Sequence, residues 1–259
     1  MVVTLSHGGY MKSQPVDEYR AQRRGGRGKQ ATATKEDDFV DRLFIANTHD
    51  YILCFSNRGR VYWLKVYNVP QGCAQLARQA DRQPGAARRQ REDHRDPAGQ
   101  GVRPTDQFVF MATAMGTVKK TPLSDFSRPR PSGIIAVDLD EGDSLIGVAL
   151  TDGKHDVMLF SSGGKAVRFD ENDVRPMGRS AHGVRGMMLD KGQRVISMLV
   201  AEDEAQSVLT ATENGYGKRT PIVEHTRHGR GTKGMIAIQQ TEPATARSSP
   251  RRWCSPMTK

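Results

Sequence analysis

The chain has 259 residues, enough for one large or two ordinary domains, and it is 36% hydrophobic and 6% aromatic, which is lean for a single deep core. Its net charge of +10 favours a polyanionic partner, although basic charge alone is weak evidence. The three cysteines, at positions 54, 73 and 254, suit neither a disulfide framework nor a Cys-x-x-Cys metal pair, so we expect a reducing cytoplasm. No apolar run reaches the ~18 residues of a membrane span, and no signal peptide precedes the strand-like opening at residues 1–5, which indicates part of a longer protein.

Five β-hairpins are predicted along the chain, each with an apolar strand, a polar turn that contains glycine, and a second strand with basic residues. They span residues 2–12, 52–62, 109–119, 157–167 and 208–218, and their turn glycines lie at positions 9, 59, 116, 164 and 215. The spacings are therefore 50, 57, 48 and 51 residues. A single hairpin cannot bury its own face, whereas stacked copies can, so this regular spacing predicts a repeat fold.

A loop rich in glycine and arginine follows each hairpin except the second. These Gly/Arg loops span residues 23–28, 128–133, 179–186 and 230–234, and an apolar strand is expected after the loop, as at 134–137 and 235–238. A further apolar strand is expected before the next hairpin, at 43–46, 145–148 and 195–198, in places after an acidic turn such as 138–143. Four strands in a unit of about 50 residues predict an all-β, propeller-like array of blades with few helices.

Two segments break this pattern. Residues 72–103 should hold the Gly/Arg loop and strands of the second blade, but they contain only Leu76 and Val102 as aliphatic residues beyond alanine; residues 241–259 are similar in composition. One interpretation is a disordered basic linker and tail. Another is out-of-frame translation of GC-rich DNA, because the tail can be encoded so that a neighbouring frame reads as an apolar strand and an acidic turn. We therefore divide the chain into an incomplete β-repeat domain at 1–240, with 72–103 anomalous, and an anomalous tail at 241–259.

The charge count depends on these segments. Together they carry 11 basic and 5 acidic residues, so the patterned remainder has a net charge of only +4. Local clusters of charge are therefore better evidence than the total.

The strongest such cluster lies in residues 19–35, which hold six basic residues and no acidic one. Glycines let the main chain approach a ligand closely, and arginine can grip phosphate oxygens with two donors. This combination favours sequence-independent binding to a nucleic-acid backbone. The candidate DNA-binding residues here are Gln22, Arg23, Arg24, Gly25, Gly26, Arg27, Gly28 and Lys29.

Basic residues also recur in the hairpins, and in a radial array we expect them to form a positive stripe along one rim. Such a rim can bend DNA because many phosphate contacts offset the elastic cost. The additional candidates are Lys12, Lys119, Lys120, Lys165, Arg168, Lys218 and Arg219.

Other chemistry is weakly supported. His225 and His228 lack ligands at metal spacing and are interpreted as a surface pair, and the acidic residues at 138–143 lack the ligand order of a calcium loop. Tyr62 and Trp63 are interpreted as packing residues rather than a base-stacking platform. No phosphate-binding loop, nucleotide fingerprint or catalytic nucleophile is identified.

The run at residues 22–28 resembles the seven-residue box of bacterial DNA gyrase A subunits, with Arg27 where that family usually has lysine. Residues 42–50, 58–67, 116–123 and 214–220 also resemble the C-terminal domain of these proteins. The resemblance covers roughly 1–71 and 105–240. It implies a six-bladed β-pinwheel that wraps DNA around its rim and supports ATP-dependent negative supercoiling by a type II topoisomerase.

The resemblance also implies what this chain lacks. The tyrosines, at 10, 19, 51, 62, 67 and 216, all lie in blade contexts, so none is expected to be the DNA-cleaving residue, and the chain is not expected to be catalytic alone. ATP and Mg²⁺ would belong to the holoenzyme, a heterotetramer of gyrase A and B subunits, with ATP bound by the latter. Two alternatives remain open: the corresponding domain of topoisomerase IV, against which the box argues, and a propeller-like protein-interaction scaffold.

Overall fold

The computed structural model describes residues 1–18, 38–71, 85–89, 107–212 and 215–238. The chain divides into two compact units, which are described separately: unit 1 contains residues 1–99 and 129–134, and unit 2 contains residues 100–128 and 135–259. Within the described ranges the secondary structure consists of β-strands joined by short 3₁₀ helices. No helix in those ranges is long and apolar enough to cross a membrane.

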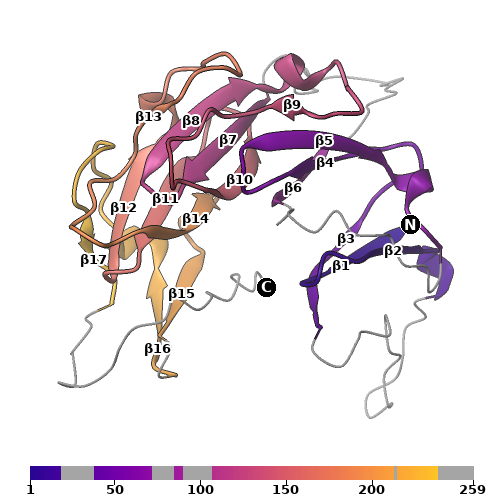
Figure 1. Ribbon diagram of the computed structural model, residues 1–259. Helices are drawn as coiled ribbons and strands as arrows, with labels where there is room; N and C mark the ends of the chain where they lie inside the picture. The colour runs from indigo at the N-terminus through magenta and orange to yellow at the C-terminus, as the bar shows by residue number, and fades with distance from the viewer. Residues whose placement is uncertain (19–37, 72–84, 90–106, 213–214, 239–259) are drawn as a thin grey trace, which may run out of the picture. The chain divides into compact units, whose positions relative to one another are not determined.

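Unit 1 holds the first two hairpins (Figure 1). Its strands are β1 (Val2–Ser6), β2 (Met11–Gln14), β3 (Val40–Ile45), β4 (Tyr51–Phe55), β5 (Arg60–Lys65), β6 (Gly85–Arg89) and β9 (Ile134–Ile135), and its 3₁₀ helices are η1 (Val16–Glu18) and η2 (Val66–Asn68). They form a three-stranded sheet in the order β2-β1-β3 and a four-stranded sheet in the order β6-β4-β5-β9.

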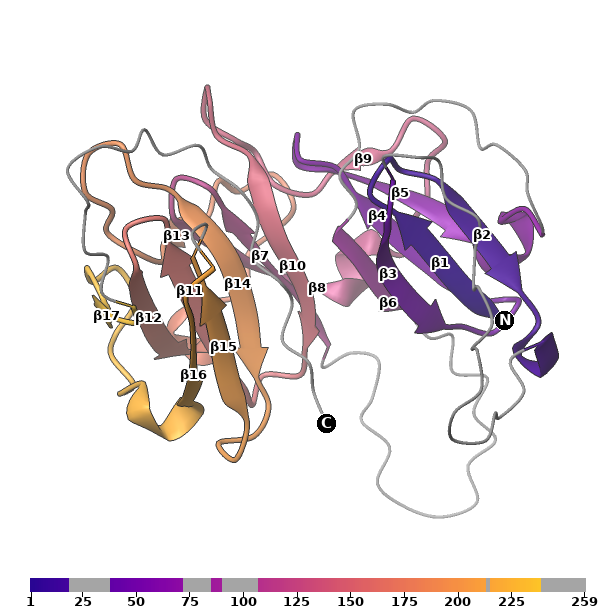
Figure 2. The same ribbon diagram turned by 90° about the horizontal axis from the view of Figure 1, so that it is seen from below.

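Unit 2 holds the remaining three hairpins (Figure 2). Two sheets have four strands, in the orders β10-β7-β8-β13 and β14-β11-β12-β17, and the last hairpin forms the pair β15-β16. The strands are β7 (Phe108–Thr113), β8 (Thr117–Pro122), β10 (Leu145–Thr151), β11 (Asp156–Ser161), β12 (Lys165–Asp170), β13 (Val184–Arg185), β14 (Val195–Ala201), β15 (Ser207–Ala211), β16 (Gly217–Pro221) and β17 (Met235–Ile236). The 3₁₀ helices are η4 (Leu123–Phe126), η5 (Glu171–Asp173) and η6 (Ile222–Glu224).

All five predicted hairpins are confirmed. Their antiparallel pairs are β1–β2, β4–β5, β7–β8, β11–β12 and β15–β16. Each turn glycine has a positive φ, from 71° at Gly59 to 86° at Gly116. This conformation is costly for residues with a Cβ, which explains why glycine recurs at that point.

The blades differ from the expected contiguous repeats because neighbouring repeats exchange a strand. In the sheet built on β7–β8, the third strand β10 arrives before the next hairpin, but the fourth strand β13 arrives after it. β17 joins β12 in the same way, and β9 joins β5. The three Gly/Arg loops among the described residues therefore end in, or lead into, a short strand that completes the preceding blade.

Glycine makes this exchange possible by allowing close main-chain approach. A Cβ at Gly234 would clash with the carbonyl oxygen of Ala166, and one at Gly183 would lie 2.6 Å from that of Val118. Both glycines have positive φ values, 71° and 109°. The loop glycines are thus required by the exchanged strands.

The anomalous segment at 72–103 lies mostly outside the described residues. Residues 85–89 form β6, which pairs with β4 at the place that β10 and β14 take in the later blades.

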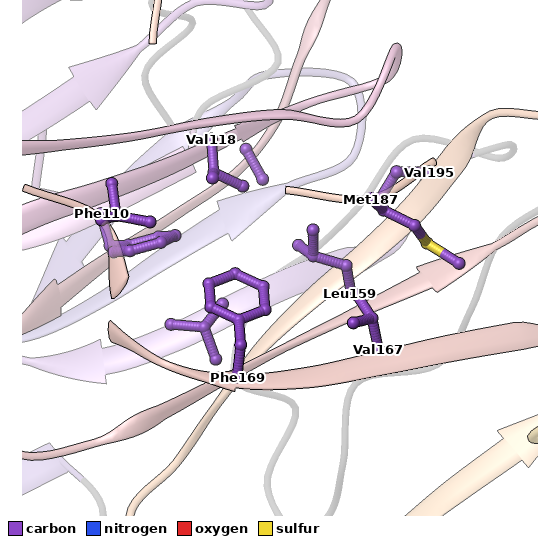
Figure 3. Packing of buried hydrophobic residues seen from close by; sticks show 10 residues of the cluster. Phe110, Val118, Leu159, Val167, Phe169, Met187 and Val195 are labelled. Atoms are coloured by element: carbon purple, nitrogen blue, oxygen red, sulfur yellow. The ribbon is translucent and has the colours of Figure 1, made fainter. Parts of the chain in front are cut away.

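The core of unit 2 lies between successive sheets, because β11 is buried on both faces. Val157 and Leu159 pack toward the previous blade against Phe110 and Val118, and Figure 3 shows Leu159 in this cluster. Met158 and Phe160 pack toward the last hairpin. This alternation follows from the two-residue period of a strand. A separate core in unit 1 joins the first two hairpins through Val3, Leu5, Met11, Ile52 and Val66.

Candidate nucleic-acid interface

Two successive Gly/Arg loops, at 179–186 and 230–234, lie side by side in unit 2. The main-chain N–H of Gly231 donates to the carbonyl of Gly186 at 2.6 Å, and that of Met188 donates to the carbonyl of Thr232 at 2.9 Å. Gly186 in turn donates to Gly116 in the turn of the preceding hairpin at 2.8 Å. The loops therefore follow one another along the edge formed by the hairpin turns.

Exposed cations lie on these loops. Arg185 is exposed, and the exposed Arg230 donates through Nη1 to the Arg185 carbonyl at 3.2 Å and through Nε to the Asp173 carbonyl at 2.9 Å. These bonds use two of the five donors of Arg230. The guanidinium group of Arg230 is thereby held on the loop edge, and guanidinium donors suit phosphate oxygens.

Unit 1 contains a related arrangement. In the Gly/Arg loop at 128–133, the main-chain N–H of Gly133 donates to the carbonyl of Arg130 at 2.9 Å. Arg60, the first residue of β5 after the hairpin turn, donates to the carbonyl of Ser132 in this loop at 3.4 Å. Arg60 and Arg130 are both exposed. The pairing of an arginine with a turn-side loop thus occurs in both units.

The box itself lies outside the described residues, so its contacts remain predictions. Its position in the repeat, after β2 and η1 and before β3, corresponds to that of the other Gly/Arg loops. The residues concerned are Gln22, Arg23, Arg24, Gly25, Gly26, Arg27, Gly28 and Lys29.

Lys119 and Lys120, expected on the rim, are buried with 1% exposure each, which corrects the prediction that they contact phosphate. Lys119 Nζ donates to the carbonyls of Ala136 at 2.8 Å and of Arg179 at 2.5 Å. Burial, with a smaller effect of the nearby Arg179 charge, lowers the pKa of Lys119 from its ordinary value to about 8. Lys120 lies 3.0 Å from Glu171 Oε2 and above the ring of Phe108. The ammonium groups of both lysines therefore bind partners inside the protein.

Arg168 requires the same correction. Its side chain is 6% exposed and donates to Asp156 Oδ2 at 2.6 Å, to Glu204 Oε1 at 2.7 Å and to two main-chain carbonyls. The bonds to these carboxylates raise the pKa of Arg168 against the opposing effect of burial, which is the largest single influence. A guanidinium engaged in this way has no donor surface to offer to DNA.

The remaining hairpin cations differ in their exposure. Lys12 is half-buried, whereas Lys218 and Arg219 are exposed. Lys165 is half-buried, and its Nζ lies 2.8 Å from Asp190 Oδ2. Lys218 and Arg219 therefore remain the strongest hairpin candidates for a phosphate contact.

The expected single stripe fails because the basic residues occupy three different hairpin positions. Lys165 lies one residue after its turn glycine; Lys12, Lys119 and Lys218 lie three residues after theirs; and Lys120, Arg168 and Arg219 lie four residues after theirs. Consecutive residues of a strand point to opposite faces, so the third and fourth positions cannot share one face of a blade.

Asp190 is a feature that sequence reasoning missed. It links the hairpin to the loop edge by accepting hydrogen bonds from Lys165 and Lys233, each at 2.8 Å. These two bonds lower the pKa of Asp190 to about 2. In the sequence Asp190 is only an isolated acidic residue in the loop that follows β13, and nothing local marks it as a partner of either lysine.

The two histidines also differ from expectation. His228 is exposed, but His225 is buried, so the interpretation as a surface pair is wrong for His225. Among the described residues no group of three or more His, Cys, Asp or Glu side chains could hold a metal ion. In the acidic turn, Asp143 accepts a hydrogen bond from the main chain of Met115 at 2.9 Å.

A family model described as "DNA gyrase C-terminal domain, beta-propeller" matches residues 1–47, 50–72, 107–152, 155–202 and 206–244. The matched ranges leave out 73–106 and 245–259, which contain most of the two anomalous segments.

Among curated relatives, the DNA gyrase A protein of Klebsiella oxytoca is 56% identical over 245 residues, which cover 93% of this chain and 27% of that protein. Its counterpart in Escherichia coli is 51% identical over 254 residues, again 93% of this chain and 27% of that protein. The chain thus spans little more than a quarter of the length of these relatives.

Solved structures show the same fold. The C-terminal domain of DNA topoisomerase IV matches with a TM-score of 0.74 at 24% identity and covers 94% of this chain and 74% of its own. The C-terminal domain of DNA gyrase A matches with a TM-score of 0.67 at 26% identity, and the match covers 93% of this chain and 78% of that one. With five turn-linked hairpins, exchanged strands and a sequence match over most of its length, the chain belongs to the family of DNA gyrase C-terminal domains with a β-propeller fold.

Proposed function

We propose that this chain binds double-stranded DNA along the edge formed by its Gly/Arg loops and wraps it as the C-terminal part of a gyrase A protein. The observation that carries this proposal is the direct hydrogen bonding between successive loops, with Arg185 and Arg230 exposed on them. Loops fixed to one another present their cations at defined intervals, which suits a backbone that must be followed over several contacts.

The wider role follows from the family. The chain would supply the wrap that lets a type II topoisomerase introduce negative supercoils, in a complex with gyrase A and B subunits at the nucleoid in the cytoplasm. No cofactor is assigned to this chain; ATP and Mg²⁺ would act elsewhere in the holoenzyme. The wrapping role needs no catalytic residue from this chain.

A salt titration tests the binding. In gel shifts with linear duplex DNA, affinity should fall about a thousandfold between 50 and 200 mM salt, because each phosphate contact releases counterions. Absent or salt-insensitive binding would favour the alternative of a protein-interaction scaffold.

The role of the box needs a separate measurement. The triple substitution Arg23→Ala, Arg24→Ala and Arg27→Ala should abolish the linking-number change that the bound protein imposes on closed circular DNA during relaxation. Some affinity for linear DNA should remain through the other loops. If the linking-number change survives, the box does not have the proposed role, and the case against a topoisomerase IV type of domain weakens.

A further inference from the structure

The fourth residue after the turn glycine has the same type of partner in three hairpins. In the first hairpin this residue is Ser13, whose hydroxyl donates to the carbonyl of Val69 at 3.0 Å. Val69 is the residue that ends η2, the 3₁₀ helix of the following hairpin. A polar side chain of one blade therefore binds the 3₁₀ helix of the next.

In the third hairpin the residue is Lys120. Its Nζ lies 3.0 Å from Glu171 Oε2 and donates to Asn172 Oδ1 at 3.2 Å. Both partners belong to η5, again the 3₁₀ helix of the following hairpin. Glu171 is fully buried, so the charge pair lies inside the protein, where it is screened little by salt.

In the fourth hairpin the residue is Arg168. Its Nη1 donates to the carbonyls of Ile222 and His225, at 3.1 and 3.2 Å. Ile222 is the first residue of η6 and His225 is its C-cap, so the guanidinium binds carbonyls at both ends of the 3₁₀ helix of the next hairpin. Asp156 on the neighbouring strand balances the charge at 2.6 Å.

The main chain at the same position holds the segment that follows each 3₁₀ helix. The carbonyl of Lys120 accepts from the N–H of Met177 at 2.8 Å, and that of Arg168 accepts from His228 at 2.7 Å. In the first hairpin the direction is reversed, since Ser13 N–H donates to the carbonyl of Pro70 at 3.0 Å. The segments at 177 and 228 lead into the Gly/Arg loops at 179–186 and 230–234. Side chain and main chain thus fix the point where each of these loops starts.

We propose that Ser13, Lys120 and Arg168 are positioning residues that fasten their blades to the 3₁₀ helix of the following hairpin. Lys120 and Arg168 thereby set the spacing of the Gly/Arg loops that follow those helices. The fastening is a property of the protein alone; its consequence for the path of DNA rests on the proposed wrapping function. The chain offers a matched control in Arg219, which holds the fourth position of the last hairpin and is exposed, with no further hairpin and 3₁₀ helix after its own among the described residues.

Hydrogen exchange tests the fastening without DNA. Lys120→Met should speed amide exchange by about tenfold or more in residues 171–177, and Arg168→Met should do so in residues 222–228, because the partner helix loses its anchor. Arg219→Met should change neither segment. Should a methionine variant fail to fold, Lys120→Arg and Arg168→Lys keep the charge: the first should retain protection, and the second should lose part of it, since one ammonium cannot serve every acceptor.

DNA binding then separates positioning from direct contact. For Lys120→Met and Arg168→Met, the slope of log affinity against log salt should stay as in the unchanged chain, while the linking-number change per bound protein falls. A slope reduced by about 0.9 for either variant would overturn the proposal, because it would mean a lost phosphate contact. Unchanged exchange in the partner helices would overturn it as well. If the unchanged chain binds no DNA but exchange responds as expected, the proposed function fails and the fastening stands.

Discussion

His225 occupies a position that is apolar in the second, third and fourth hairpins. The residue three positions after the start of that helix is Val69, Phe126 and Val174 in the earlier repeats, and each is buried. His225 is 3% exposed, its ring packs edge-on against Phe160, and neither ring nitrogen has a hydrogen-bond partner. An unpaired buried polar group costs about 1–3 kcal/mol, so this imidazole is a local weakness.

The burial of His225 predicts a loss of stability in acid. Desolvation lowers the pKa of His225, and the charges of Lys218 and Arg168 lower it further, against an opposing effect of Glu224. The unfolded chain takes up the proton near pH 6.5, whereas the folded chain resists it, so the free energy of unfolding should fall as pH drops below about 6.5 until the folded pKa is reached. Denaturant unfolding of His225→Phe should show greater stability, by about 1 kcal/mol at neutral pH and more in acid.

The exposed neighbour supplies the control for this measurement. His228→Ala removes a histidine whose side chain is already in solvent, so its unfolding curve should follow that of the unchanged chain. Parallel pH profiles for the His225→Phe variant and the unchanged chain would contradict the assignment of the acid sensitivity to His225.

At the scale of the element, the exchanged strands depend on glycine. Gly234→Ala should disrupt the pairing of β17 with β12, because the new Cβ would clash with the carbonyl of Ala166. Gly192→Ala is the matched control: its φ of 80° is similarly positive, but nothing lies within 4 Å of the added atom. We expect a loss of about 1 kcal/mol for the control from backbone strain alone, and a further loss of about 1–3 kcal/mol for Gly234→Ala from overpacking. Equal losses in thermal unfolding would show that the close approach carries no energy of its own.

The elements also show what the sequence could and could not predict. The hairpins were predictable because glycine turns with polar flanks and apolar strands are local signals. The exchange of β13 and β17 was not, since two-residue strands have no periodicity and their partners are distant in sequence. The burial of Lys119, Lys120 and Arg168 was missed because a charged side chain is expected in solvent unless its partners are known, and several of those partners, such as Arg179, Glu171 and Ile222, lie in the following repeat.

For the whole molecule, the distribution of charge matters more than its total. The net charge of +10 falls to +4 when the two anomalous segments are set aside, and the buried hairpin cations contribute nothing to the surface. The cations that we propose to contact DNA are those on the loop edge and in the box, together with the exposed Lys218 and Arg219. Salt dependence should therefore respond to the place of a cation and not to the overall charge.

This expectation can be tested with single substitutions that each remove one positive charge. Arg185→Ala and Arg230→Ala should each reduce the slope of log affinity against log salt by about 0.9, since each removes one phosphate contact. Arg230→Ala should also lower the linking-number change, because Arg230 donates to the carbonyls of Arg185 and Asp173 and so holds the two loops together. Lys154→Ala removes one exposed charge from the turn before β11, outside the Gly/Arg loops, and should leave the slope unchanged. An equal reduction for Lys154→Ala would mean that DNA responds only to net charge, and the loop edge would then have no special role.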